Sequence, residues 1–153
     1  MGNQPPDEKS VDLLLVEDSH ADARLTIEAL RDARILNTIH VVTDGLTALQ
    51  YLRGEGEYRD AVKPDFIILD LNLPKKSGLE VLQEVKEDER LRSIPVIILS
   101  SSKAEEDIAK AYTYQASCYI TKPIDADQYF TAIRSLKELW FKVVSLPART
   151  AVL

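Results

Sequence analysis

Several features that would assign a protein to a special class are scarce or missing in this sequence. It has one cysteine, Cys118, among 153 residues, which excludes an internal disulfide and favours a reducing, cytoplasmic setting. No apolar run approaches the roughly 20 residues of a membrane-spanning helix. The first ten residues carry two prolines and no apolar core, unlike a secretory signal. We therefore expect a soluble, intracellular protein.

An excess of basic residues is also missing. The formal net charge is -6, whereas general nucleic-acid binding requires a basic surface. The 45% of hydrophobic and 29% of charged residues are typical of a globular chain. The length suits one domain with its own core. We predict a flexible tail at 1–10, one domain at 11–146 and a short tail at 147–153.

Apolar runs that resemble buried strands alternate with helical patterns along the chain. The predicted strands are 11–16, 38–42, 66–69, 96–99 and 118–121, and an amphipathic pattern follows each of them, the last at about 125–145. Such alternation predicts an α/β protein with a doubly wound parallel sheet covered on both faces. For five units the flavodoxin-like (βα)5 fold, with strand order 2-1-3-4-5, is expected.

Polar residues follow four of these predicted strands. The first ends at Glu17 and Asp18, the third at Asp70, the fourth at Ser100 and the fifth at Lys122. Ligands of open α/β sheets bind at the carboxyl ends of the strands, where the strand order reverses. We therefore expect these residues to lie in one crevice.

Three acids in that crevice would repel one another. A hard divalent cation relieves this repulsion, and oxygen ligands beside a phosphate suit Mg²⁺. The charges of Glu17, Asp18, Asp70, one Mg²⁺ and Lys122 sum to zero. A carboxylate beside a metal indicates phosphoryl transfer, since carboxylates form aspartyl-phosphates, and the hydroxyl of Ser100 can donate to a phosphoryl oxygen. We predict that Asp70 is the acid that is phosphorylated.

The arrangement resembles a known family over residues 11 to about 139. The residues that carry the resemblance to the receiver domain of two-component response regulators are Glu17-Asp18, Asp70, Ser100, Tyr119 and Lys122-Pro123. The resemblance implies that Asp70 is the phosphoacceptor. Asp18 would bind Mg²⁺ directly, Glu17 would act on the metal largely through water, and Asn72 would offer its backbone carbonyl to it. Lys122 would contact the phosphoryl group.

The resemblance also implies a switch and an unusual peptide bond. Ser100 and Tyr119 would form the hydroxyl and aromatic switch pair, and Lys122-Pro123 would be a cis peptide. Glu17 departs from the family pattern, because many receivers have Asp there, and this leaves the metal affinity open.

Segments outside the site resemble a narrower group, the small response regulators paired with cyanobacterial phytochrome histidine kinases. They read VEDSHADARL, LSSSKAEEDI, SCYITKPID and LWFKVVSLP. The implied partner is a phytochrome-type histidine kinase, with no nucleic acid and no membrane involved. Because the sequence ends soon after the fifth helix, we expect output through association with another protein.

The last predicted helix carries the expected dimer interface. Its 21 residues would span about 31 Å, whereas a five-residue strand spans only about 17 Å, so its second half should project past the sheet. The apolar residues there are Leu139, Trp140, Phe141, Val143 and Val144. Such a surface favours self-pairing, and the relatives imply a homodimer through the fourth helix, fifth strand and fifth helix.

Simpler interpretations exist for the single residues. Glu17 and Asp18 could merely cap the first helix, Asp70 could begin a turn, and Ser100 could belong to a serine triplet that caps a helix. None of these interpretations explains why such polar residues occur together at the ends of four predicted strands.

Two other functions compete with a signalling switch. A phosphatase of the haloacid dehalogenase type also uses an Asp after a strand, but needs a second acid two positions later, where this chain has Asn72. A receiver-like binding module that is never phosphorylated is disfavoured because every expected residue type is present. We therefore predict a phosphoacceptor switch and not an enzyme.

Overall fold

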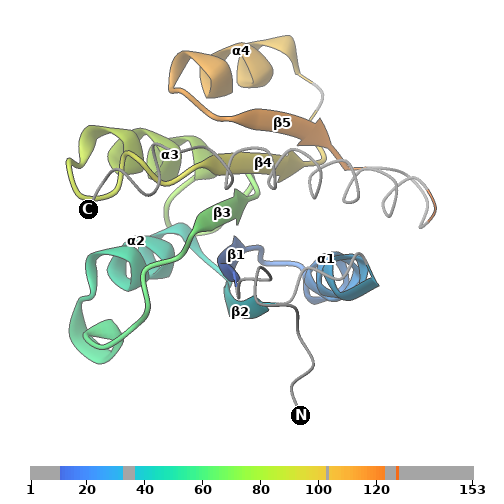
Figure 1. Cartoon of the computed structure of the whole chain (residues 1–153). Coiled ribbons are helices and arrows are strands. Elements are labelled where there is room, and N and C mark those ends of the chain that lie inside the picture. Colours follow the sequence, from blue (N-terminus) through green and yellow to red (C-terminus); the bar gives the residue numbers. More distant parts are fainter. Residues whose placement is uncertain (1–10, 33–36, 103, 123–126, 128–153) are drawn as a thin grey trace, which may run out of the picture.

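The structure is a computed structural model that describes residues 11–32, 37–102, 104–122 and 127. Strands and helices alternate along the chain (Figure 1). The strands are β1 (Val11–Val16), β2 (Asn37–Val42), β3 (Phe66–Leu69), β4 (Val96–Ser100) and β5 (Cys118–Thr121). The helices are α1 (His20–Asp32), α2 (Gly45–Arg53), α3 (Gly78–Glu87) and α4 (Glu105–Thr113), with a short 3-10 helix, η1 (Gly56–Tyr58), in the connection before β3.

All five strands are parallel and lie in the order β2-β1-β3-β4-β5. This confirms the predicted fold class and strand order. The central strand β3 is buried along its whole length, which explains why it appears in the sequence as an unbroken apolar run.

Successive residues of the strands point to opposite faces of the sheet, and each face has its own core. On one face Leu13 and Leu15 pack with Leu30 of α1. On the other face Leu14 and Val16 belong to the cluster that includes residues of α2, α3 and α4. Figure 1 shows α1 on one side of the sheet and α2 and α3 on the other. Both faces are therefore covered, as a parallel sheet requires.

Side-chain caps fix the starts of α2 and α3. The Asp44 carboxylate accepts from the backbone N–H of Thr47 at 2.7 Å and from its hydroxyl at 2.9 Å. Ser77 and Glu80 form a complete capping box, in which each side chain accepts from the other residue's N–H. These caps satisfy N–H groups that have no partner inside the helix.

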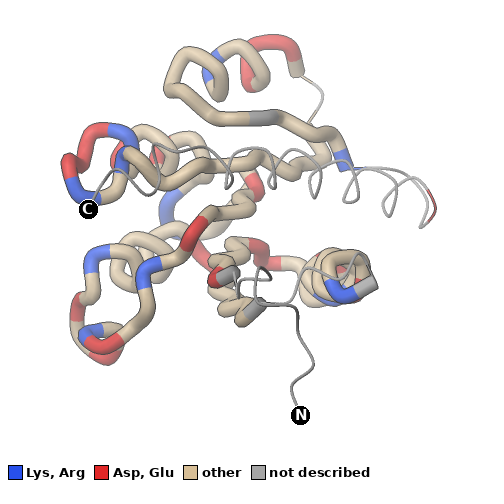
Figure 2. The backbone as a smooth tube through the Cα atoms, in the orientation of Figure 1, with Lys and Arg blue, Asp and Glu red and all other residues tan. Residues whose placement is uncertain are grey.

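Ion pairs join α3 to α2 and to the loop after β3. The guanidinium of Arg53 lies 3.1 Å from Glu84 and 3.8 Å from Asp88, and Lys76 also pairs with Glu84. Figure 2 shows basic and acidic segments interspersed along these elements. Of these partly exposed pairs, the one between Lys76 and Glu84 connects the loop that follows Asp70 to α3.

None of the described helices is both long and apolar enough to cross a lipid bilayer.

Several predictions concern parts of the chain outside the described residues. They are the tails at 1–10 and 147–153, the long helix at about 125–145, the cis peptide at Pro123 and the dimer residues Leu139, Trp140, Phe141, Val143 and Val144. These remain predictions from the sequence.

Candidate functional site

Strand register brings the polar strand ends together. Val16 pairs with Leu69, and the N–H of Asp70 donates to the carbonyl of Val16 at 3.1 Å. On the other side, the N–H of Lys122 donates to the carbonyl of Ser100 at 2.7 Å. The residues that follow β1, β3 and β5 therefore meet at one edge of the sheet, together with the last residue of β4.

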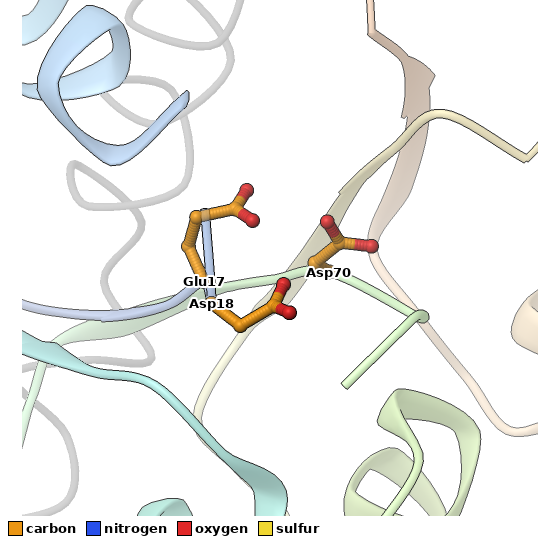
Figure 3. A group of neighbouring side chains, drawn as sticks. All are labelled: Glu17, Asp18 and Asp70. Atoms are coloured by element: carbon orange, nitrogen blue, oxygen red, sulfur yellow. The ribbon is translucent and has the colours of Figure 1, made fainter. Parts of the chain in front are cut away.

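Three carboxylates gather at this edge (Figure 3). Glu17, Asp18 and Asp70 each offer an oxygen, and these atoms lie within 4.8 Å of one another. Glu17 and Asp70 are buried, while Asp18 is exposed. Glu17 and Asp18 extend from the end of β1 and Asp70 from the end of β3, and all three point into a shared space (Figure 3).

Both oxygens of the Asp70 carboxylate have hydrogen-bond donors. Oδ1 accepts from the backbone N–H of Asn72 at 2.9 Å and from the hydroxyl of Ser100 at 3.1 Å. Oδ2 accepts from the ammonium of Lys122 at 2.7 Å. Because Asp70 is only 4% exposed, these donors offset much of the cost of burying its charge.

Lys122 is shared among three carboxylates. Its Nζ lies 2.7 Å from Glu17 Oε1, 2.7 Å from Asp22 Oδ2 and 2.7 Å from Asp70 Oδ2. Burial alone would lower the pKa of the Lys122 ammonium, but the three carboxylates outweigh it and raise the pKa. Lys122 is therefore a fixed positive charge at this edge of the sheet.

The carboxyl of Glu17 is strongly affected by its burial. Burial raises the pKa of its carboxyl to about 7, and the negative charge of Asp70 acts in the same direction, while Lys122 opposes both. Its second oxygen, Oε2, accepts from the N–H of Ser19 at 3.1 Å. An additional cation in this cluster would favour the ionised form of Glu17.

Close backbone packing fixes the loop that follows Asp70. A Cβ on Gly78 would lie 2.2 Å from the carbonyl oxygen of Asp70 and 2.5 Å from the Cα of Leu71. The N–H of Gly78 also donates to the carbonyl of Leu71 at 2.9 Å. A side chain at position 78 would therefore push α3 away from the loop that carries Asp70 and Asn72.

The loop between β4 and α4 links Ser100 to Tyr119. The Tyr119 hydroxyl donates to the carbonyl of Ser102 at 2.8 Å, and the N–H of Ser102 donates to Ser100 Oγ at 3.3 Å. The hydroxyl of Ser102 donates to Asp107 of α4 at 2.6 Å. Ser102 thus connects the serine beside Asp70 to both α4 and β5.

The structure brings Glu17, Asp18, Asp70, Ser100 and Lys122 into one cluster, with Asn72 and Tyr119 next to it. Their individual roles remain predictions. The other residue of the predicted set, Pro123, lies outside the described part of the chain.

Two participants were not predicted from the sequence. Asp22 resembles an ordinary acid in the first turn of a helix, and only its spacing of three after Ser19 sets it apart. Ser102 takes part through its backbone carbonyl as well as its side chain, and no sequence pattern reports a backbone acceptor.

The donor set fits a divalent cation. Glu17, Asp18 and Asp70 supply carboxylate oxygens, the ligands that hard divalent ions prefer. Asp18 faces solvent and keeps the cluster open for water as a further ligand.

Comparisons with known proteins point to one family. Residues 13–134 match the response regulator receiver domain. The response regulator Rcp1 of Synechocystis sp. is 41% identical over 136 residues, which cover 89% of this chain and 92% of that protein.

Solved structures of cyanobacterial proteins are similar as well. The phosphorylated cyanobacterial phytochrome response regulator RcpA shares 45% identity with a TM-score of 0.85, covering 91% of this chain and 99% of RcpA. The Mn²⁺-bound form of Rcp1 shares 40% identity with a TM-score of 0.84, covering 90% of this chain and 99% of that one. The match over residues 13–134 and the similarity to Rcp1 show that the chain belongs to the response regulator receiver domain family.

Proposed function

We propose that the protein accepts a phosphoryl group from a histidine kinase on Asp70 and signals through contacts with another protein. The observation that carries this proposal is the environment of the Asp70 carboxylate. Ser100 and Lys122 donate to its two different oxygens, and the oxygens of Glu17 and Asp18 lie within 4.8 Å. Such a carboxylate is buried, oriented and next to acids that attract a cation.

The residues around Asp70 have distinct roles in the proposed transfer. A carboxylate oxygen of Asp70 attacks phosphorus while the bond from phosphorus to the kinase histidine breaks, and the histidine nitrogen keeps the electron pair. Lys122 and the Ser100 hydroxyl then donate to phosphoryl oxygens, which carry the spread negative charge. The cluster orients these donors before the reaction begins.

We assign Mg²⁺ as the metal of the site. Receiver domains bind a divalent metal at this acidic pocket. Asp18 and Asp70 would hold the ion directly, Glu17 would act on it through water, and the backbone carbonyl of Asn72 would complete the protein ligands. When bound, the ion supplies positive charge that offsets the acids and the phosphoryl oxygens.

We assign Ser100 and Tyr119 as the switch. The hydroxyl of Ser100 donates to the Asp70 carboxylate. Ser102 donates its N–H to Ser100 and accepts from the Tyr119 hydroxyl through its carbonyl, so it connects the two. A Ser100 hydroxyl that follows the phosphoryl group would change this loop and release the ring of Tyr119. Phosphorylation would thereby bias two arrangements of the surface formed by α4 and β5.

We infer that the kinase partner is of the phytochrome type. The support is the similarity to RcpA, a phytochrome response regulator, across nearly the whole chain. Initial rates of phosphotransfer from several purified histidine kinases would test this, since a cognate kinase should be fastest by orders of magnitude.

We also propose a homodimer that uses the apolar end of the last predicted helix. Its residues Leu139, Trp140, Phe141, Val143 and Val144 were identified from the sequence alone. Light scattering at micromolar concentration should find a dimer for the wild-type chain and a folded monomer for Trp140→Glu. A monomeric wild type would contradict the proposal.

Intact-mass measurement tests the phosphoacceptor assignment. Incubation with a small phosphodonor such as acetyl phosphate should add a single labile phosphoryl group when Mg²⁺ is present and none after chelation. Asp70→Asn should abolish the adduct, whereas Asp60→Asn, the same charge change at an exposed position, should keep it. Undiminished labelling of Asp70→Asn would show that another residue accepts the group.

A further inference from the structure

Asp22 belongs to the Lys122 network although it is outside the predicted set. Its Oδ2 lies 2.7 Å from Lys122 Nζ, the same distance as the oxygens of Glu17 and Asp70. The Asp22 side chain is 35% exposed, whereas those of Glu17 and Asp70 are 3% and 5% exposed. Asp22 is therefore the one of these three carboxylates that keeps access to solvent.

The start of α1 directs Asp22 toward Lys122. The hydroxyl of Ser19 accepts from the N–H of Asp22 at 3.2 Å, so Ser19 caps the helix and Asp22 occupies the third helical position. In the equivalent arrangement at α3, the acid at that position, Glu80, accepts from the N–H of Ser77 at 3.0 Å.

The same pattern is used differently in α1. The N–H of Ser19 donates to Glu17 Oε2 at 3.1 Å, and the Asp22 carboxylate accepts from Lys122. One Ser-x-x-acid pattern closes a capping box in α3, while in α1 it connects the helix start to the acidic cluster.

Only part of this network overlaps with the metal site. The group of oxygens within 4.8 Å of one another comprises Glu17, Asp18 and Asp70 and leaves out Asp22. Lysine has three N–H donors, and Lys122 directs one at each of Glu17, Asp22 and Asp70. Two of its three partners, Glu17 and Asp70, are thus also members of the acidic cluster proposed to attract the cation.

A dication and an ammonium on the same carboxylates repel each other. Glu17 and Asp70 bind a divalent cation more strongly when the ammonium moves away from them. Asp22 accepts the ammonium at a place outside the ligand group and within reach, since it already holds the same Nζ.

We propose that Asp22 is a positioning residue, which retains the Lys122 ammonium when Glu17 and Asp70 interact with the metal instead. Asp22 thereby keeps the lysine next to the phosphorylation site. This inference rests on the proposed function, because it concerns the same site. It assigns to Asp22 a role in metal affinity that acts through Lys122 and involves no contact with the metal.

A simpler role for Asp22 is to stabilise the start of α1, where an acid interacts favourably with the helix dipole. That role would change the stability of the protein and would leave the response of Lys122 to metal unchanged. The two roles are separated by a readout on Lys122 itself.

The experiment is a Mg²⁺ titration at fixed ionic strength, followed by calorimetry and by the NMR signal of the Lys122 side-chain ammonium. Three variants are compared with wild type. Asp22→Asn removes the charge with little change in shape, Asp22→Glu keeps the charge, and Glu28→Gln removes a charge from an exposed position further along α1.

We expect Asp22→Asn to raise the Mg²⁺ dissociation constant about fivefold, as for the loss of one charged contact in a partly exposed site. Glu28→Gln should change it less than about twofold, and Asp22→Glu should recover most of the affinity. In wild type the Lys122 signal should shift on metal saturation and remain protected from exchange with water. In Asp22→Asn it should lose that protection when metal is added.

The outcomes distinguish this inference from the function on which it rests. If wild type binds Mg²⁺ and is phosphorylated, but Asp22→Asn matches Glu28→Gln in affinity and its Lys122 signal stays protected when metal is added, the role of Asp22 is refuted. The proposed function is then unaffected. If wild type neither binds Mg²⁺ nor accepts phosphate, both are wrong.

Discussion

The hydroxyl of Tyr119, on strand β5, donates a hydrogen bond of 2.8 Å to the backbone carbonyl of Ser102, in the loop between β4 and α4. The two residues are 17 positions apart in sequence, and the bond joins the loop to β5. Burial raises the pKa of the Tyr119 hydroxyl above its usual value. The hydroxyl is therefore protonated at neutral pH and acts as the donor.

Removing this bond gives the first prediction. Tyr119→Phe keeps the ring but leaves the Ser102 carbonyl without this donor, so the free energy of unfolding should fall by about 1 kcal/mol. Urea denaturation measures the change. Tyr58→Phe is a suitable control, since that hydroxyl makes no hydrogen bond within the described part of the chain. Equal losses in both variants would mean that the bond to Ser102 contributes nothing.

The second prediction concerns Ser100, whose hydroxyl donates to Asp70 Oδ1 and accepts from the Ser102 N–H. Ser100→Ala should still be phosphorylated, because Asp70 and Lys122 remain. It should lose most of the phosphorylation-dependent change in amide hydrogen exchange of the loop and α4, since the link from Asp70 to Ser102 is broken.

Ser101→Ala provides a matched control for that experiment. Ser101 is the next residue in the chain and is exposed, whereas Ser100 is fully buried. A Ser100→Ala variant whose exchange responds to phosphorylation as fully as Ser101→Ala would remove Ser100 from the switch.

Much of this architecture was predictable from the sequence for a physical reason. A strand buried on both faces is apolar throughout, so β3 and β4 appear as short apolar runs with definite ends. The first polar residue after such a run lies at the edge of the sheet. Asp70 and Lys122 could therefore be placed on the same edge once the strand order was predicted.

The missed features depend on side-chain direction and backbone acceptors. Asp22 lies in the first helical turn, where an acid is favourable in any helix, and its contact with Lys122 spans 100 positions. Ser102 accepts through its carbonyl, a group that every residue has. Neither contact leaves a sequence pattern that distinguishes Asp22 from an ordinary acid at a helix start, or Ser102 from an ordinary loop residue.

The third prediction concerns the cap of α2. Asp44 is 8% exposed, and although burial raises its pKa, hydrogen bonds from Thr47 and the charge of Lys75 outweigh this and lower the pKa below its usual value. Asp44→Ala should reduce the free energy of unfolding by about 1 kcal/mol at pH 7. Asp44→Asn, which keeps a capping oxygen, should lose less.

The pH dependence of that effect follows from the sign of the shift. An acid with a lowered pKa in the folded state stabilises the fold above its unfolded pKa, about 3.9 for Asp. This contribution is lost as the pH falls through the lower folded value. The difference between wild type and Asp44→Ala in urea unfolding should therefore be constant from pH 6 to 8 and shrink below about pH 4. A difference that grows in acid would contradict the assigned direction.

The fourth prediction concerns Gly78, where α3 meets the loop after β3. Because an added Cβ would lie 2.2 Å from the Asp70 carbonyl oxygen and 2.5 Å from Leu71 Cα, Gly78→Ala must displace backbone atoms. We expect the free energy of unfolding to fall by about 2–3 kcal/mol, as for overpacking of a dense interior. Phosphorylation of Asp70 should also slow in the fraction that remains folded, because its carboxylate would shift relative to Ser100 and Lys122.

Gly56→Ala separates these effects from a general cost of replacing glycine. Gly56 has a φ of +58° and nothing within 4 Å of an added Cβ. Its replacement should therefore cost only the strain of a left-handed backbone conformation, about 1–2 kcal/mol. It lies in η1, away from the phosphorylation site. If both variants are destabilised but only Gly78→Ala accepts phosphate slowly, the close approach of α3 is what positions Asp70. Equal phosphorylation rates in the two folded variants would show that the loop tolerates the displacement, and that Gly78 serves packing alone.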